Sequence, residues 1–143
     1  MYTCTFFGHR NGCSVSDEKI LTAIQEFISQ GVKQFYVGNN GDFDRRVLGC
    51  LNKTRREHPE IAYFVVLAYL PSEGTEGAPY TIYPEIEKGP ARFAISRRNR
   101  WMVEQSTHCI CYVAHRWGGA YQFASLAKRK GLQVINLAPA DLI

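Results

Sequence analysis

His108-Cys-Ile-Cys-Tyr-Val-Ala114, followed by His115-Arg-Trp-Gly-Gly119 and by Ala120-Tyr-Gln-Phe-Ala-Ser-Leu-Ala-Lys-Arg-Lys130, is the stretch that decides the fold. The first segment is an apolar run of residues that favour strands, the second contains two adjacent glycines, and the third is typical of a helix that Gly131 ends. A strand, a glycine turn and a helix form the unit that directs backbone N–H groups at a phosphate. Because glycine pairs also occur in purely structural turns, the rest of the chain has to decide between the two meanings.

The same alternation of strand and helix runs through the whole chain. Apolar runs predict five strands, at residues 3–8, 32–38, 61–70, 108–114 and 132–137, and helical periodicity predicts four helices, at about 17–30, 42–57, 91–106 and 120–130. The third run is almost continuously apolar, which is typical of a strand covered on both faces in a parallel sheet. We therefore predict an α/β, Rossmann-like three-layer sandwich with a five-stranded, mainly parallel sheet of strand order 3-2-1-4-5.

Composition limits the class of protein. The 143 residues fit a single domain spanning residues 1–143, with a net charge of only +4. No run of about 18 apolar residues exists and the chain starts directly with a strand, so we expect no membrane span and a cytoplasmic protein. Five cysteines lack C-x-x-C spacing, and Cys109 and Cys111 alternate within a predicted strand as apolar fillers. We expect no metal site and no cofactor.

Four loops meet at one edge of the predicted sheet. They are residues 8–10, 38–42, 71–90 and 115–119, and the second and fourth are glycine turns that run into helix N-termini. In this strand order the crevice lies where the order reverses, at the carboxyl ends of strands 1 and 4. We expect a phosphate-bearing small molecule there. Residues 71–90 form a long irregular stretch, which is expected to be either a lid or ligand wall or disordered, with a short strand or turn around 80–83.

Basic residues also gather near this edge. Arg97-Arg98-Asn99-Arg100 spans every direction around one predicted helix, so at least one arginine should point to the sheet edge, where burial requires an anionic partner. Arg10 and Arg116 follow strands 1 and 4 and are candidates for bonds to phosphate. The G-x-G-x-x-G, G-x-x-x-x-G-K-[ST] and G-x-S-x-G motifs are absent, which disfavours dinucleotide binding, P-loop hydrolysis and a serine hydrolase.

Four short motifs resemble one family. Phe6-Phe7-Gly8-His9-Arg10 is similar to the F-[TS]-G-H-R opening of small stand-alone SLOG proteins, and Phe35-Tyr36-Val37-Gly38 with Gly41-x-x-Asp44 resembles their second-strand motif. Arg98-Asn99-Arg100-Trp101-Met102 resembles their R-N-x-x-M helix, and Gly118-Gly119 with Ala127-Lys-Arg-Lys-Gly131 resembles their last glycine turn and helix end. SLOG is the Rossmann-like superfamily that joins the Smf/DprA DNA-uptake proteins with the Lonely Guy cytokinin-activating enzymes. The motifs cover nearly the whole chain.

The resemblance implies a fold that binds nucleotides or nucleotide-derived ligands, often as a homodimer, in a bacterial or phage protein. Lonely Guy enzymes cleave the N-glycosidic bond of nucleoside monophosphates with a P-G-G-x-G-T-x-x-E motif. Here that stretch reads Trp117-Gly-Gly-Ala-Tyr-Gln-Phe-Ala124, without the catalytic glutamate. Asp44 and Glu104 are the nearest candidates for a catalytic acid, and the chain is not expected to be an enzyme.

Three functions compete at this stage. The leading interpretation is a sensor or sequestering protein for a nucleotide-derived small molecule, with nucleic acid an unlikely partner. The alternatives are a phosphoribohydrolase and single-stranded DNA binding. The candidate ligand-binding residues come from all the loops and from the arginine helix: Gly8, His9, Arg10, Gly38, Asn39, Asn40, Gly41, Asp44, Arg98, Asn99, Arg116, Gly118, Gly119 and Ala120.

Overall fold

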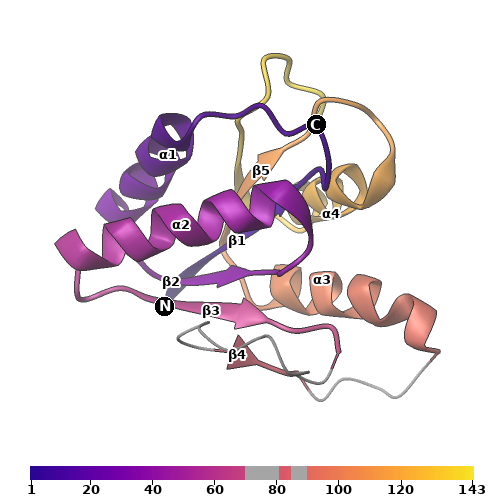
Figure 1. The fold of residues 1–143 in the computed structure, drawn as a ribbon, viewed down its shortest axis with the longest axis horizontal. Coiled ribbons are helices and arrows are strands. Elements are labelled where there is room, and N and C mark those ends of the chain that lie inside the picture. Colours follow the sequence, from indigo (N-terminus) through magenta and orange to yellow (C-terminus); the bar gives the residue numbers. More distant parts are fainter. Residues whose placement is uncertain (70–80, 85–89) are drawn as a thin grey trace.

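Parallel strands form one sheet in the computed structural model, which describes residues 1–69, 81–84 and 90–143 (Figure 1). Within these ranges the sheet has six strands, in the order β4-β3-β2-β1-β5-β6. Their bounds are β1 Tyr2–Gly8, β2 Val32–Val37, β3 Ala62–Val66, β4 Thr81–Ile82, β5 His108–Tyr112 and β6 Gln133–Asn136. Every neighbouring pair is parallel.

The predicted number of five strands was wrong. The five predicted strands are β1, β2, β3, β5 and β6, and they lie in the predicted order. The sixth, β4, pairs with β3 through Val65↔Thr81 and Val66↔Ile82. β4 lies where a short strand or turn was expected, around residues 80–83, but that element was not counted in the sheet because two residues are too few to give a periodic signal. The remainder of the segment 71–90, expected as a lid or ligand wall, falls at 70–80 and 85–89, outside the described residues.

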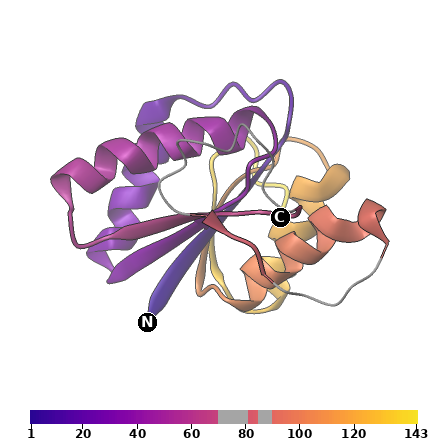
Figure 2. The same cartoon turned by 60° about the horizontal axis from the view of Figure 1, so that its bottom comes forward.

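Four α-helices occur in the described parts of the chain and cover both faces of the sheet. They are α1 Asp17–Ser29, α2 Gly41–Glu57, α3 Ala94–Glu104 and α4 Gly118–Arg129, and a 3₁₀ turn at Ala91–Phe93 leads into α3. Figure 2 shows α1 and α2, in indigo to magenta, on one side of the sheet and α3 and α4, in orange and yellow, on the other. None of these helices has the length and apolar character needed to cross a membrane.

Two apolar cores result from the alternation of side chains along the strands. Phe6 packs in the core under α1 and α2, with Phe27 and Phe43, whereas the next residue, Phe7, packs in the core under α3 and α4. Cys109 and Cys111 lie together in this second core as buried, free thiols, on one face as their spacing predicted. The Rossmann-like three-layer arrangement was thus predictable from the sequence.

The strand order also positions the functional edge. β1 lies between β2 and β5. The chain passes from β1 through α1 to β2 on one side, and after β4 it returns through α3 to β5 on the other side. The carboxyl ends of β1, β2 and β5 therefore lie side by side, close to the N-termini of α2 and α4, which follow β2 and β5. This is the crevice position expected for a doubly wound sheet.

Candidate functional site

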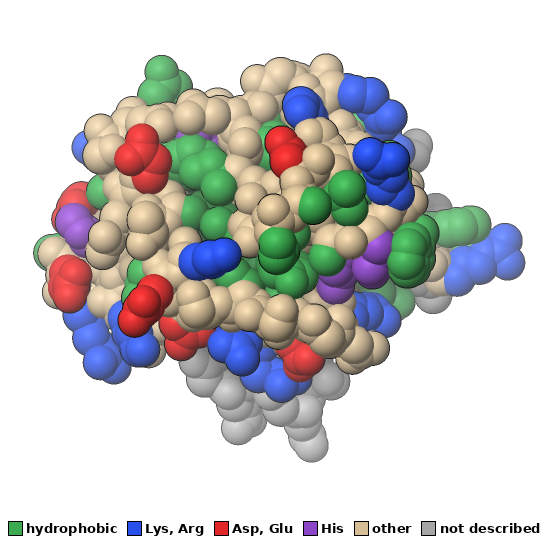
Figure 3. Space-filling model, turned by 90° about the horizontal axis from the view of Figure 1, so that it is seen from above, with side chains coloured by type: hydrophobic (Ala, Val, Ile, Leu, Met, Phe, Trp, Pro, Cys, Tyr) green, Lys and Arg blue, Asp and Glu red, His purple; other side chains and the backbone are tan. Residues whose placement is uncertain are grey.

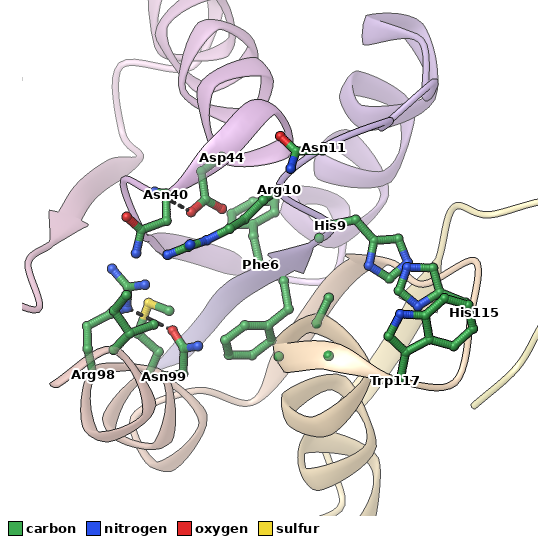
Figure 4. Close-up of a pocket in the computed structure, with 17 residues that line it drawn as sticks. Phe6, His9, Arg10, Asn11, Asn40, Asp44, Arg98, Asn99, His115 and Trp117 are labelled. Atoms are coloured by element: carbon green, nitrogen blue, oxygen red, sulfur yellow. Dashed lines mark hydrogen bonds between the residues drawn. The ribbon is translucent and has the colours of Figure 1, made fainter. Parts of the chain in front are cut away.

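A pocket of about 340 Å³ lies at the carboxyl end of β1, between α2, α3 and the N-terminus of α4 (Figure 4). Its walls come from all four of these elements and from the loop after β5. The residues that line it are Phe6, Phe7, Gly8, His9, Arg10, Asn11, Asn40, Asp44, Ile95, Arg98, Asn99, Met102, His115, Trp117, Gly118, Gly119 and Ala120. Figure 4 shows two chemically different ends, with polar side chains on one side of Phe6 and stacked rings on the other.

The polar end is held together by Arg98, which is only 3% exposed. Its Nη1 donates to the Val66 carbonyl at 3.0 Å and to Asn39 Oδ1 at 3.4 Å, and its Nε donates to Asn99 Oδ1 at 2.8 Å. These bonds tie α3 to the end of β3 and to the β2–α2 loop. The prediction that one arginine of the cluster is buried is confirmed, and its partners include backbone and amide oxygens.

Asp44, in the first turn of α2, lies beside Arg98 of α3. Its Oδ2 accepts the backbone N–H of Asn40 at 3.0 Å. Burial raises the pKa of Asp44 to about 6, while the Asn40 hydrogen bond and the positive charges of Arg98 and Arg10 act in the opposite direction. The site therefore contains a carboxylate that changes charge close to neutral pH.

Two glycines allow this close packing. A Cβ on Gly38 would lie 2.9 Å from the guanidinium carbon of Arg98 and 2.9 Å from Asp44 Oδ2. Gly41 has φ +91°, and a Cβ there would collide with the backbone of Arg10. The next residue, Asp42, donates its N–H to the Arg10 carbonyl at 2.9 Å. The loops after β1 and β2 are therefore in direct contact, which brings Arg10 toward the polar end (Figure 4).

The other end of the pocket is a stack of three rings. The ring centroids of His9 and His115 lie 3.7 Å apart, and those of His115 and Trp117 also lie 3.7 Å apart, with nearly parallel planes. His9 Nε2 accepts the N–H of Ala114 at 2.9 Å, so this nitrogen carries no proton. Burial, and then the proximity of His115, lower the pKa of His9. The stack is therefore anchored at a neutral imidazole and ends at Trp117, which is 68% exposed.

Between the two ends lies the N-terminus of α4. Its capping residue, Trp117, is extended and forms no side-chain hydrogen bond to the helix. Gly119 lines the pocket, and the position of its missing Cβ has no atom within 4 Å. The N–H groups of the first helical turn have no intrahelical partners, and here neither a capping side chain nor a Cβ at Gly119 blocks access to them.

Most of the candidate residues meet in this pocket. The exceptions are Gly38, Asn39 and Gly41, which support it from behind, and Arg116, which is exposed and does not line it. His115 and Trp117 stack on each other across a bend at residues 115–116, and the intervening Arg116 is exposed. Of the two candidate acids, Asp44 lines the pocket, whereas Glu104 is exposed at the end of α3 and does not.

Several lining residues were not among the candidates from sequence. They are Phe6, Phe7, Asn11, Ile95, Met102, His115 and Trp117. His115 and Trp117 are the important omissions, because in their loop Arg116 was selected for its charge. The sequence signal for them was a pair of aromatic rings, two residues apart, directly before the glycine pair.

Comparison with known proteins shows the fold. No protein-family model and no curated protein sequence matches the chain. Among solved structures, DNA processing protein A (DprA) from Streptococcus pneumoniae matches with a TM-score of 0.69 at 15% identity, and DprA from Helicobacter pylori with 0.65 at 16%. Each match covers 99% of this chain, but only 52% and 66% of those longer chains.

The comparison corrects one prediction from the sequence. The Helicobacter structure is described by its single-stranded DNA binding mode, so nucleic acid is not an unlikely partner for a chain with this fold. It also bears out the resemblance noted in the motifs. The chain has the Rossmann-like fold of DprA, a member of the SLOG superfamily, over nearly its whole length.

Proposed function

We propose that the crevice binds single-stranded DNA. The observation that carries the proposal is the exposed ring of Trp117, at the end of the His9–His115–Trp117 stack and directly before the uncapped N-terminus of α4. An aromatic face offers a stacking surface to any base, and free N–H groups at a helix N-terminus suit a backbone phosphate. The two features are adjacent in the chain, as base and phosphate are adjacent in a nucleotide.

Arg10 adds a cationic group to the same site. It lines the pocket, and its guanidinium makes no hydrogen bond or ion pair with a described residue, so it adds positive charge to the pocket that favours an anionic ligand. The similarity to Helicobacter DprA, whose structure is described as binding single-stranded DNA, supports this proposal. The chain spans about half to two thirds of the DprA structures that it matches, so the proposal concerns this crevice alone.

The distribution of charge favours a local site over a long groove. Figure 3 shows one face of the molecule on which Lys and Arg side chains alternate with Asp and Glu, without a continuous basic track. The net charge of +4 is mild as well. Affinity should therefore come from the few nucleotides that reach the pocket and Trp117.

The test is fluorescence anisotropy of a labelled oligonucleotide with wild-type protein and Trp117→Ala. Loss of one base–aromatic stack should weaken binding by about 1–3 kcal/mol, roughly five- to 150-fold. Tyr2→Ala is the matched control, because Tyr2 is also an exposed aromatic, 51% accessible, but lies at the start of β1, at the opposite edge of the sheet. Equal affinity of Trp117→Ala and wild type would contradict the proposal.

A free nucleotide-derived molecule is the second candidate ligand. It is favoured by the size of the pocket, about 340 Å³, and by the nearly complete burial of its polar end, where Asp44 and Asn99 are each 8% exposed. Mass spectrometry of the small molecules released on denaturation would recover an intact nucleotide if the protein sequesters one. Recovery of a free base or a ribose phosphate would instead support hydrolysis, for which Asp44 is the candidate acid that lines the pocket.

A further inference from the structure

The polar end of the pocket contains hydrogen-bonding atoms that the fold leaves unused. Asp44 Oδ2 is bonded to Asn40, but Asp44 Oδ1 has no partner among the described residues. Asn99 Oδ1 accepts from Arg98 Nε, which fixes the orientation of the amide, and leaves Asn99 Nδ2 as a donor without a described partner. In the described chain, the side-chain polar atoms that are both fully buried and without a hydrogen-bond partner are Thr5 Oγ1 and His115 Nδ1. Asp44 Oδ1 and Asn99 Nδ2 are not among them. Both are therefore accessible from the pocket that their residues line.

This combination does not suit a phosphate. A phosphate has only acceptor oxygens and carries negative charge, so the free oxygen of an ionised Asp44 would repel it. An acceptor and a donor side by side suit the edge of a nucleobase, which also presents both kinds of group. Phosphate has a better position elsewhere in the same pocket, at the N-terminus of α4.

The two ends of the pocket differ in exposure to solvent, and this difference determines how a nucleotide would lie in it. Asp44, Arg98 and Asn99 are 8%, 3% and 8% exposed, whereas Trp117 is 68% exposed. From these exposures we take the polar end as the floor of the pocket and Trp117 as its mouth. Figure 4 shows the two on opposite sides of Phe6. One base can be inserted to the floor while its phosphate lies at α4 and the neighbouring base stacks on Trp117.

We infer that the floor of the pocket reads the pairing edge of this inserted base, and that it prefers cytosine, which has an exocyclic amino group beside a ring acceptor, to thymine. The inference rests on the proposed binding of single-stranded DNA. Cytosine presents an amino donor beside a ring acceptor, which match Asp44 Oδ1 and Asn99 Nδ2. Thymine presents a carbonyl oxygen in place of the amino group, and this oxygen would face the Asp44 carboxylate. Asp44 is then a specificity-determining residue.

The test compares oligo(dC), oligo(5-methyl-dC) and oligo(dT) of one length at pH 8, where Asp44 is ionised. We expect both cytosine oligomers to bind about five- to 100-fold more tightly than oligo(dT), and the methylated oligomer excludes the thymine methyl group as the cause. Asp44→Asn should reduce this ratio to near one, because an amide can turn to donate to the thymine carbonyl.

A probe without the amino group makes the test independent of how well the variant folds. An oligomer in which 2-pyrimidinone replaces cytosine keeps the ring acceptor and lacks the donor, so it should bind wild-type protein more weakly than oligo(dC). Equal affinity of wild type for all of these oligomers would overturn the inference and leave single-stranded DNA binding in place. Absence of binding to every oligomer would overturn both.

Discussion

Asp44 shows how a single residue can serve structure and recognition at once. Its carboxylate accepts a hydrogen bond that shapes the start of α2, lies close to two arginines and still presents one oxygen to the pocket. Burial penalises its ionised form more than these partners favour it, which is why the pKa rises to about 6. Ionisation of Asp44 therefore lowers the free energy of unfolding.

We predict that Asp44→Asn becomes increasingly stabilising as the pH rises. The pKa of Asp44 is about 6 in the folded chain and about 3.9 in an unfolded one, so the folded state holds this proton more tightly, and wild type loses stability as the pH rises through this window. Asparagine does not ionise. Urea unfolding should show the stability of the variant relative to wild type increasing by about 2–3 kcal/mol between pH 4 and pH 7.5. A constant difference across this range would show that Asp44 ionises normally in the fold.

For single residues, the sequence predicted which types of side chain gather at the site better than it predicted which of them point into it. The cluster at 97–100 implied that one arginine is buried, and Arg98 is, because the helical period places it over the end of β3 while Arg100 stays exposed. The loop at 115–119 did not reveal which side chains face inward. That choice depends on the bend at residues 115–116, whose conformation the sequence does not fix.

At the scale of elements, α4 is the part of the structure closest to the proposed phosphate. Its first turn contains Gly118, with φ +89°, and Gly119. Positive φ explains the first glycine, whereas open space around Gly119 means that the fold does not require a glycine there. The proposed access of a phosphate to the backbone gives a physical reason for glycine at position 119.

We predict that Gly119→Val reduces binding of single-stranded DNA at least tenfold with little change in melting temperature. The added side chain would occupy the space through which a phosphate reaches the N–H groups of α4. Gly49→Val is the matched control, since Gly49 is an exposed residue in the middle of α2 with equally open space around it. Binding by anisotropy and thermal unfolding of both variants check this. Undiminished affinity in Gly119→Val would remove the helix N-terminus from the site.

Elements were predictable where they are long or apolar. The strands β1, β2, β3 and β5 contain mostly buried residues, and β6 is partly buried and centred on Val134 and Ile135. Their order follows from right-handed crossovers between parallel strands. β4 contributes two residues at the edge and depends on pairing with β3, with the Leu67 N–H donating to the Ile82 carbonyl at 2.8 Å. The sequence indicated a short strand or turn around residues 80–83, but it could not show that this segment joins the sheet, because that depends on pairing with β3.

For the molecule as a whole, charge sets how binding responds to salt. With a net charge of +4 and mixed charges on the face in Figure 3, few phosphates should be neutralised at once. The logarithm of the association constant should fall with the logarithm of salt concentration with a slope of about −0.7 to −1.5, which corresponds to about one or two phosphates on a single strand. Titrations between 50 and 300 mM salt, roughly the physiological range, measure it. A slope steeper than about −3 would indicate a basic track and contradict a local site.

The central position of β1 has a consequence for how the chain acquires its structure. Cys4 in β1 pairs with His108 in β5, so one side of the middle strand has to wait for a partner about a hundred residues later in synthesis. Until β5 leaves the ribosome, β1, β2 and β3 form a half-sheet in which β1 has an unpaired edge. The face that carries Phe7, which α3 and α4 later cover, is then exposed as well. Such an intermediate is vulnerable to aggregation. Docking of β5 closes this edge and completes the crevice in the same step, so a chain that has not finished folding has no binding site to offer.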